Sequence, residues 1–522
     1  MTMNKKLNAN GLQLSNQLAA VKLSSSNESK GRLINVAGVG GVVSVAYEQL
    51  RNAAEYAQEH LLIQNAIRRF FVRSLSFHNH TTVRKTISED LIIELTQSGY
   101  IKNNSQSSEV ITKLKHVIHK HYNNYWRLKA AGIDDHKVHD WTLDLLSIES
   151  ETILVEDTIQ TIYLQFAYHH YSAIIQKKLF VSNDSEDSGY DVSLYISVHR
   201  ALLKSDLAAV RYDMQKLYDV SDSNINEYAK FHENIDEVFA SDQTNKITLY
   251  INKYGAPLRI LRSMITDNDK ASEILVDSEV FDKTYASQIK QEYRRAESKL
   301  NRGLVKSIAF LLITKALIGV AIEVPYDLIT TREIAWLPLI VNLLTPIIYM
   351  ALIRFGFNMP GTANAKAIRR YADDMLYGDQ SQVSLYPTAR KKSYPIGFSI
   401  AYALMFLIVF SMVTYLLFII GFSIVQGVMF FVFLAAASFL GFRLSRIVRE
   451  LELITVKPGA ITTIRDFLFT PFTFLGKWLS EKYQKVNVVA LILDTFIELP
   501  LKTVLRLLRQ WTGFLDDKKD EI

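Results

Sequence analysis

IGFSIAYALMFLIVFSMVTYLLFII, residues 396–420, and FSIVQGVMFFVFLAAASFLGF, residues 422–442, are two uncharged runs separated only by Gly421. A helix needs roughly 20 apolar residues to cross about 30 Å of hydrocarbon, and both runs reach that length. Such runs are too long and too apolar to be buried helices of a water-soluble domain. We therefore predict two membrane-spanning helices joined by a tight turn.

Two further apolar runs precede this pair. Residues 334–353 begin close to Trp336, where the indole of an interfacial tryptophan is expected. Residues 307–324 are the weakest candidate, because Lys315 interrupts them and Glu323 stands at their end. We predict a transmembrane domain over residues 301–442, with helices at about 307–324, 334–353, 396–420 and 422–442.

Lysine and arginine gather beside the spans on one side of the membrane. Cytoplasmic loops hold the excess of these residues, so the bias sets the orientation. The opposite side has only Arg332. We expect an integral membrane protein of a bacterial cytoplasmic membrane, with both termini on the cytoplasmic side. The residues that set this bias are Lys290, Arg294, Arg295, Lys299, Arg302, Lys306, Arg354, Lys366, Arg369, Arg370, Arg390, Lys391, Lys392, Arg443, Arg446 and Arg449.

The composition fits a water-soluble part joined to a membrane part. The chain has 522 residues, of which 49% are apolar, and a mean hydropathy of +0.07. Its formal net charge of +6 accumulates beside the spans, which favours anionic lipid headgroups over nucleic acid as the partner. Cysteine is absent, which excludes disulfides, thiolate nucleophiles and cysteine-ligated metals.

The part before the spans is predicted to be helical. Residues 1–31 are rich in Asn, Ser and Lys, and we expect a disordered tail there. Residues 32–300 repeat apolar positions at a spacing of three to four and show no two-residue alternation, so we expect an all-helical cytosolic domain. Residues 279–324 lack proline, which predicts one long helix that enters the membrane as the first span. The fold class is all-α.

Residues 443–522 form the C-terminal segment, with amphipathic patterns over 461–483 and 486–514. These patterns combine aromatic residues with lysine and arginine, a composition that suits helices lying in the headgroup region. The alternative is that both helices pack on the N-terminal domain or on another subunit. The expected membrane-surface contacts are Trp478, Lys482, Lys502, Arg506, Arg509 and Trp511.

Lys315 is the only charge deep within the four predicted spans. An ammonium at mid-depth needs a partner, because a charge there costs roughly 2.5–3.5 kcal/mol on insertion scales. Asn342 lies at a similar depth in the second span, and Pro346 frees the backbone carbonyl of Asn342. We expect an intramembrane polar pair of Lys315 and Asn342, which serves either as a structural clamp or as an ion or proton site.

Motifs for catalysis or cofactors are weak. His116, His119 and His121 precede His139-Asp140, an outline that resembles HD-type hydrolases, but the apolar helix and the glycine that flank His-Asp in that family are missing. No carboxylate at a matching spacing completes a zinc site. The glycines at 38–41 lack the GxGxxG pattern of dinucleotide loops. We expect no catalytic, cofactor or metal residues.

These observations favour a non-enzymatic membrane anchor or scaffold for a cytosolic partner, assembled as a homo-oligomer or with another protein. The alternative is an oligomeric ion channel or small-solute transporter with Lys315 in its pathway. A third possibility is a membrane-bound hydrolase that uses the histidine cluster.

The charge bias makes the topology testable. Reporter fusions after residue 300, after Tyr377 and at the C-terminus should be cytoplasmic, whereas a fusion near Thr331 should be external. Protease digestion of the N-terminal part from outside intact cells would contradict this orientation.

Overall fold

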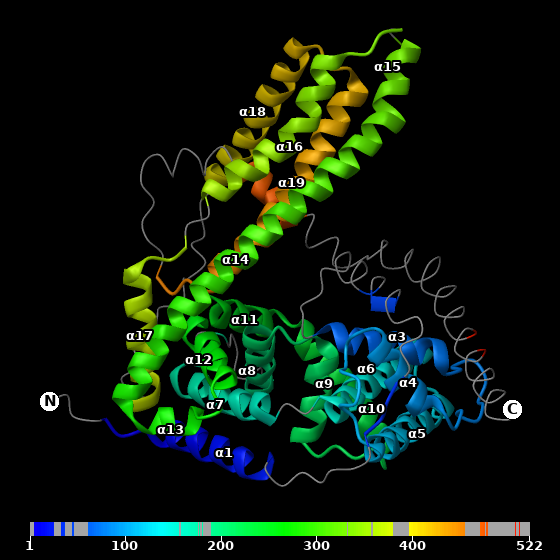
Figure 1. Cartoon of the computed structure of the whole chain (residues 1–522), viewed down its shortest axis with the longest axis vertical. Coiled ribbons are helices and arrows are strands. Elements are labelled where there is room, and N and C mark those ends of the chain that lie inside the picture. Colours follow the sequence, from blue (N-terminus) through cyan, green and yellow to red (C-terminus); the bar gives the residue numbers. More distant parts are fainter. Residues whose placement is uncertain are drawn as a thin grey trace, which may run out of the picture. The chain divides into compact units, whose positions relative to one another are not determined.

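The computed structural model describes residues 5–25, 33–36, 44, 45, 48, 61–155, 158–175, 177, 180, 189–330, 332–356, 359–378, 396–454, 470–475, 477, 478, 507 and 511. Within these residues every regular element is a helix, and the β pairing consists of an isolated bridge between Leu33 and Ser107 (Figure 1). The predicted all-α class is confirmed. The chain divides into a bundle unit, Met1–Asn8 with Asn252–Val486, and an N-terminal unit, Ala9–Ile251 with Asn487–Ile522.

The N-terminal unit is built from short and medium helices around several apolar cores. One core joins α3 to α6 through fully buried side chains such as Ile67, Phe71 and Leu146. Asp134 and Asp206 cap α6 and α9 by accepting hydrogen bonds from backbone N–H groups in the first turn. Its helices are α1 (Ala9–Ser25), α3 (Leu62–Ser74), α4 (Ile87–Gln97), α5 (Ser108–Ala130), α6 (Asp135–Leu154), α7 (Thr158–Ile174), α8 (Tyr190–Val198), the π-helix η4 (His199–Leu203), α9 (Leu207–Leu217), α10 (Ile225–Ala240) and α11 (Asp242–Tyr254), which ends beyond the unit boundary.

The prediction of a disordered tail over residues 1–31 is wrong for α1. Leu14 and Leu18 are buried, and α1 packs against α7. The Asn10 side-chain amide donates to the carbonyl of Phe166 at 3.3 Å. A helix of this length is only marginally stable alone in water, so tertiary packing rather than local propensity orders it.

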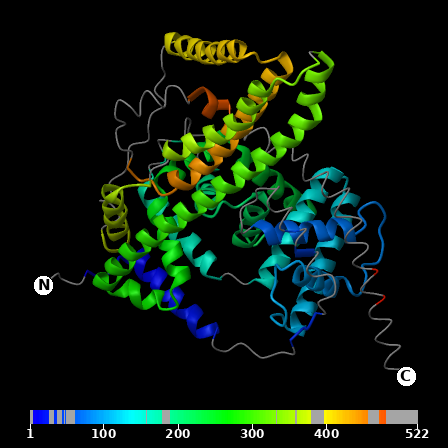
Figure 2. The same ribbon diagram turned by 45° about the horizontal axis from the view of Figure 1, so that its top comes forward.

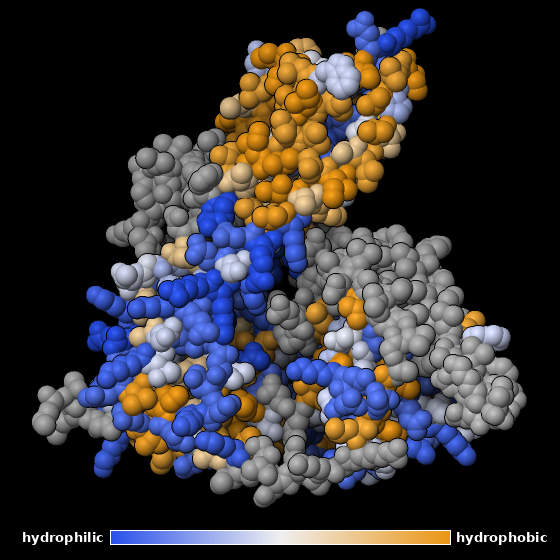
Figure 3. Space-filling view, viewed as in Figure 1, coloured by the Kyte–Doolittle hydropathy of each residue, from blue (hydrophilic) through white to orange (hydrophobic). Residues whose placement is uncertain are grey.

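The bundle unit contains four helices that are long and apolar enough to cross a membrane, as expected of a membrane protein. Figure 3 shows their apolar side chains as a continuous band beside a hydrophilic surface on the first half of α14. The helices of this unit are α12 (Ala256–Asp267), α13 (Ala271–Val276), α14 (Ser278–Ile318), the π-helix η5 (Gly319–Glu323), α15 (Val324–Thr330), α16 (Trp336–Gly356), α17 (Thr362–Tyr377), α18 (Ile396–Ile420) and α19 (Ile424–Arg449).

The first span is the end of a single helix, Ser278–Thr330, that is 53 residues long. The predicted long helix is confirmed, but it continues past the predicted end at residue 324. Pro325 does not stop it. A proline removes one backbone hydrogen bond and crowds the preceding turn. The wider π-helix η5 forms that preceding turn and ends at Glu323, two residues before the proline. The extra turns carry Asp327 into the bundle, where Glu323 is also buried.

Close packing joins α14, α16 and α19. Leu311, Met350 and Ala437 are almost completely buried in their shared core. At Gly441, an added Cβ would lie 2.7 Å from Ile353 Cδ1, so α19 approaches α16 as closely as a glycine permits. By contrast, α18 lies at a wide angle to these helices (Figure 2), although its Val409 and Leu417 belong to their core. The turn at Gly421, where φ is +89°, joins the end of α18 to α19.

Outside the spans, α17 packs on α12 and α14 through its apolar face. Asn364 uses its whole amide to hold this arrangement. Its Nδ2 donates to Tyr293 Oη at 2.8 Å and to the Leu451 carbonyl at 2.8 Å, and its Oδ1 accepts from the backbone of Leu453 and Ile454. One side chain thus connects α17, α14 and the segment that follows α19.

Asn364→Ala should destabilise the bundle unit by about 2 kcal/mol, because it leaves buried donors and acceptors unpaired. Thermal unfolding of the full chain in detergent measures the effect. Lys366→Ala, an exposed change on the same helix, is the matched control and should stay within about 0.5 kcal/mol of the native chain. Equal destabilisation by both variants would show that Asn364 has no special role.

Candidate functional site

The bundle encloses a polar cluster centred on Glu323. The Nζ of Lys315 donates to Glu323 Oε1, and the side chains of Lys315 and Glu323 are 2% and 0% exposed. These residues are eight positions apart, and the π-helix η5 between them widens the helix so that both side chains meet. From α16, Asn342 Nδ2 lies 3.2 Å from Glu323 Oε1 and 3.1 Å from Oε2.

Gln426 of α19 and Asp327 of α15 extend the cluster toward the connection between α15 and α16. The backbone carbonyl of Gln426 lies 3.2 Å from Asn342 Nδ2. The Nε2 of Gln426 donates to Asp327 Oδ2 at 2.9 Å, and the same oxygen lies 3.3 Å from the backbone nitrogen of Ala335. Because these contacts come from α14, η5, α15, α16 and α19, the cluster fixes the three packed spans in register.

Gln426 also begins α19. Its Oε1 accepts from the Ser423 backbone, and the Ser423 hydroxyl accepts from the Gln426 backbone, so the two residues form a capping box. Both the oxygen and the nitrogen of the Gln426 side-chain amide are therefore hydrogen-bonded. The helix cap and the polar cluster depend on the same residue.

An apolar shell surrounds the ammonium of Lys315. Its Nζ lies 4.7 Å from the centroid of the Phe433 ring, a cation–π distance, and Leu311 is buried one turn away. In such a medium charge–charge and charge–dipole interactions are much stronger than in water. Lys315 is therefore bound to Glu323 and shielded from lipid.

The structure places Lys315 and Asn342 in one cluster, with the Glu323 carboxylate between them. The prediction that Lys315 is the only deep charge is wrong, because the helix continues and buries Glu323 and Asp327. The sequence placed Glu323 at the end of the predicted span and Asp327 beyond it, so neither was counted as a deep charge. The available signal was the position of Glu323, about two helical turns after Lys315.

The amide oxygen of Asn342 has no hydrogen-bond partner among the described residues, although the side chain is 0% exposed. Most buried polar groups in folded proteins are paired, so an orphan acceptor beside a buried carboxylate is unusual.

Of the expected membrane-surface contacts, Lys482, Lys502, Arg506 and Arg509 lie outside the described residues. Trp478 and Trp511 are described and exposed. Within the same segment Phe472 is buried and contacts the rings of Tyr349 and Phe410, at centroid distances of 6.0 and 5.4 Å. Residues 470–475 thus pack on α16 and α18.

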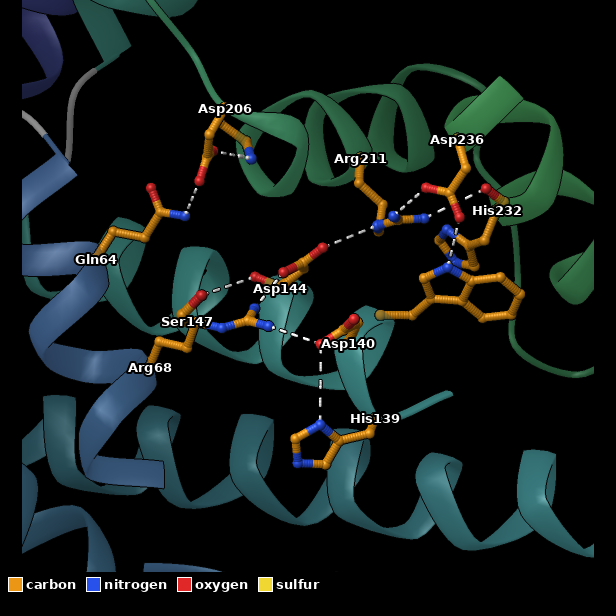
Figure 4. A network of polar contacts seen from close by, with 12 residues as sticks. Gln64, Arg68, His139, Asp140, Asp144, Ser147, Asp206, Arg211, His232 and Asp236 are labelled. Carbon is orange, nitrogen blue, oxygen red and sulfur yellow. Dashed lines mark hydrogen bonds and ion pairs between the residues drawn. The ribbon is translucent and has the colours of Figure 1, made fainter. Parts of the chain in front are cut away.

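A second polar network crosses the N-terminal unit (Figure 4). Arg211, 1% exposed, donates to Asp144 at 3.3 Å and to Asp236, and it also reaches the His232 carbonyl. Trp141 Nε1 donates to Asp236 Oδ2 at 3.0 Å. The guanidinium is thereby paired on both sides, and the network ties α6, α9 and α10 together.

The histidines that resemble a hydrolase motif serve this network and its surroundings. Asp140 pairs with Arg68 at 3.0 Å, and the neighbouring His139 ring, 3.9 Å away, together with Arg68 lowers the pKa of Asp140. His121 binds Glu149; burial opposes the charge of this carboxylate, but His121 and Lys120 lower its pKa to about 2. Among the described residues, no three His, Cys, Asp or Glu side chains are placed to hold a metal.

Comparison with protein-family models, curated proteins and solved structures found no match for this chain.

Lys315→Leu should destabilise the full chain by about 3 kcal/mol, because it leaves the Glu323 carboxylate buried without its counter-ion. The double variant Lys315→Leu, Glu323→Leu removes both charges and should recover most of that loss. Thermal unfolding in detergent compares the two. If the double variant is as unstable as the single one, the ion pair is not the source of the effect.

Proposed function

We propose that this protein is a membrane anchor or scaffold, which holds a protein partner or a second copy of the chain at the cytoplasmic face of a bacterial-type membrane, with both termini cytoplasmic. The single observation that carries the proposal is the unbroken 53-residue helix, Ser278–Thr330. Its first half lies outside the apolar band and its second half is a span. A rigid helix transmits position and orientation between these two regions.

Packing along this helix supports the proposal. The first half of α14 contacts α12, α13 and α17, and the second half contacts α16 and α19. Tyr285 in the first half is fully buried and donates to the Pro257 carbonyl at 2.8 Å. One helix, α14, thus holds α12, α13 and α17 and is itself held by the bundle. A docking surface on these helices would keep a fixed distance from the membrane.

Charge at the band edge also supports it. Lys290, Arg294, Arg302 and Lys306 are exposed on α14 before the span. Basic side chains next to a span are attracted to anionic headgroups by about 1 kcal/mol each. Anionic lipids are therefore proposed partners on the side where the termini lie.

The interior of the bundle favours an anchor over a pore. Glu323, Asn342 and Gln426 are completely buried, and α14, α16 and α19 also share an apolar core. The second candidate is an oligomeric channel or small-solute transporter with Lys315 in its pathway. Its support is the group of ionisable side chains within the spans, which in membrane proteins often marks an ion path.

Full chain reconstituted in liposomes should carry no ionic current, and the chain purified from membranes in mild detergent should retain a stoichiometric cytosolic protein or a second copy. The matched variant for the current measurement is Lys315→Leu, Glu323→Leu, which keeps the bundle packed without the charges. A reproducible wild-type current whose selectivity shifts in this variant would refute the anchor and support the channel.

A further inference from the structure

One face of α14 carries basic side chains that are followed directly by large apolar ones. Successive members lie three or four positions apart, a spacing that places them in one row along a helix. All of them are exposed. We call this row the α14 stripe, and it consists of Lys299, Arg302, Lys306, Phe310, Ile313 and Leu317.

The α14 stripe faces away from the packed spans. Leu300 and Leu311, on the other side of the helix, are 0% and 1% exposed in the core shared with α16 and α19. Phe310, Ile313 and Leu317 are 52%, 59% and 65% exposed. These three apolar side chains are therefore available to a ligand that lies outside the bundle.

No acidic residue interrupts the α14 stripe. The sequence has neither Asp nor Glu between Lys299 and Lys315, and Glu297, just before the stripe, lies 3.7 Å from Arg354 of α16. Arg302 donates through Nε to the carbonyl of Ser298 at 3.4 Å, which uses one of the five N–H groups of its guanidinium. The basic end of the stripe thus presents positive charge at the edge of the apolar band.

The dimensions of the α14 stripe match a lipid in one leaflet. Lys306 and Leu317 are eleven residues apart, which is about 16 Å along the helix, and one leaflet contributes about 15 Å of hydrocarbon. Arg302 and Lys306 lie about one turn apart, so one phosphate group can contact both. We propose that the stripe binds one anionic phospholipid, whose phosphate lies between Arg302 and Lys306 and whose acyl chain lies along the apolar half.

Charge decides which phospholipid binds. A choline headgroup carries its own cation, which lysine and arginine repel, whereas phosphatidylglycerol presents the negative charge of its phosphate alone. The inference rests on the proposed function, in which anionic lipids are partners of the basic residues of α14. It adds that one lipid occupies a defined site on one face of this helix, and a lipid held there fixes the depth of α14 in the membrane.

The test uses the absence of cysteine from the chain, because a single introduced cysteine then carries a fluorophore at a chosen position. Ile313→Cys places the label on the α14 stripe. Leu344→Cys places it on α16 at a similar depth, because Lys315 and Asn342 both contact Glu323 and each labelled position is two residues from one of them. Leu344 is 43% exposed.

Each labelled full chain is reconstituted with dibrominated phosphatidylglycerol or dibrominated phosphatidylcholine, which quench the fluorophore on contact. At position 313, phosphatidylglycerol should associate about five-fold more strongly than phosphatidylcholine, which is the effect of one basic side chain beside an anionic headgroup. At position 344 the two lipids should agree within about two-fold, because no comparable row of basic residues leads to it.

Two double variants in the Ile313→Cys chain assign the preference. Arg302→Gln, Lys306→Gln should abolish it. Lys270→Gln, Lys283→Gln is the matched control and should keep it: it removes the same charge from exposed positions of the same unit, and Lys283 lies about 35 Å along α14 from Lys306, beyond the screening length of about 10 Å. Circular dichroism checks that every variant remains helical.

Equal quenching by both lipids at position 313 would overturn the proposal, as would a preference that both double variants lower equally. So would a preference that persists in about 1 M NaCl, where the screening length is about 3 Å, since it would not arise from charge. Quenching by neither lipid would show that protein covers the α14 stripe, which also contradicts the proposal. The anchor function is judged separately by ionic current and by the retained partner, so the two proposals fail independently.

Discussion

The burial of the Lys315–Glu323 ion pair is the constraint on which the membrane bundle depends. A charge in hydrocarbon must be neutralised and hydrogen-bonded, so the bundle has to bring an acceptor to the ammonium and donors to the carboxylate. The π-helix η5 supplies the register, and Asn342 and Gln426 come from the two neighbouring spans. The need to neutralise this ion pair therefore brings α14, α16 and α19 into contact. Apolar side chains fill the rest of the interface between them.

The helix α14 connects the buried ion pair to the part of the bundle unit on which the proposed anchor function depends. The helix that carries Lys315 also carries, in its first half, the surface against which α12, α13 and α17 pack. Asn364 connects α17 back to α14 and to the segment after α19. Any shift of the span relative to the bundle would be transmitted to these helices without a flexible joint.

The N-terminal unit also has to neutralise a buried charge. Arg211 is as deeply buried as Lys315, and it too is satisfied by acidic side chains from neighbouring helices. There, however, Asp236 and Arg68 remain partly exposed, so water shares the solvation of the network. In the bundle, Lys315 and Glu323 are 2% and 0% exposed, so the side-chain amide of Asn342 and the ion pair itself supply the solvation that water shares in the N-terminal network.

The sequence by itself determined the spans and the all-α class, because the length and polarity of an apolar run are local properties that the membrane selects directly. It also identified Lys315 as a charge in need of a partner and placed Asn342 at its depth. Only the tertiary structure decided that Glu323 is that partner, because the π-helix before Pro325 and the continuation to Thr330 arise from packing within the bundle. The helix α1 also depends on tertiary packing, because Leu14 and Leu18 are buried where α1 packs against α7. A contact between segments so far apart in the chain leaves no local pattern in the sequence.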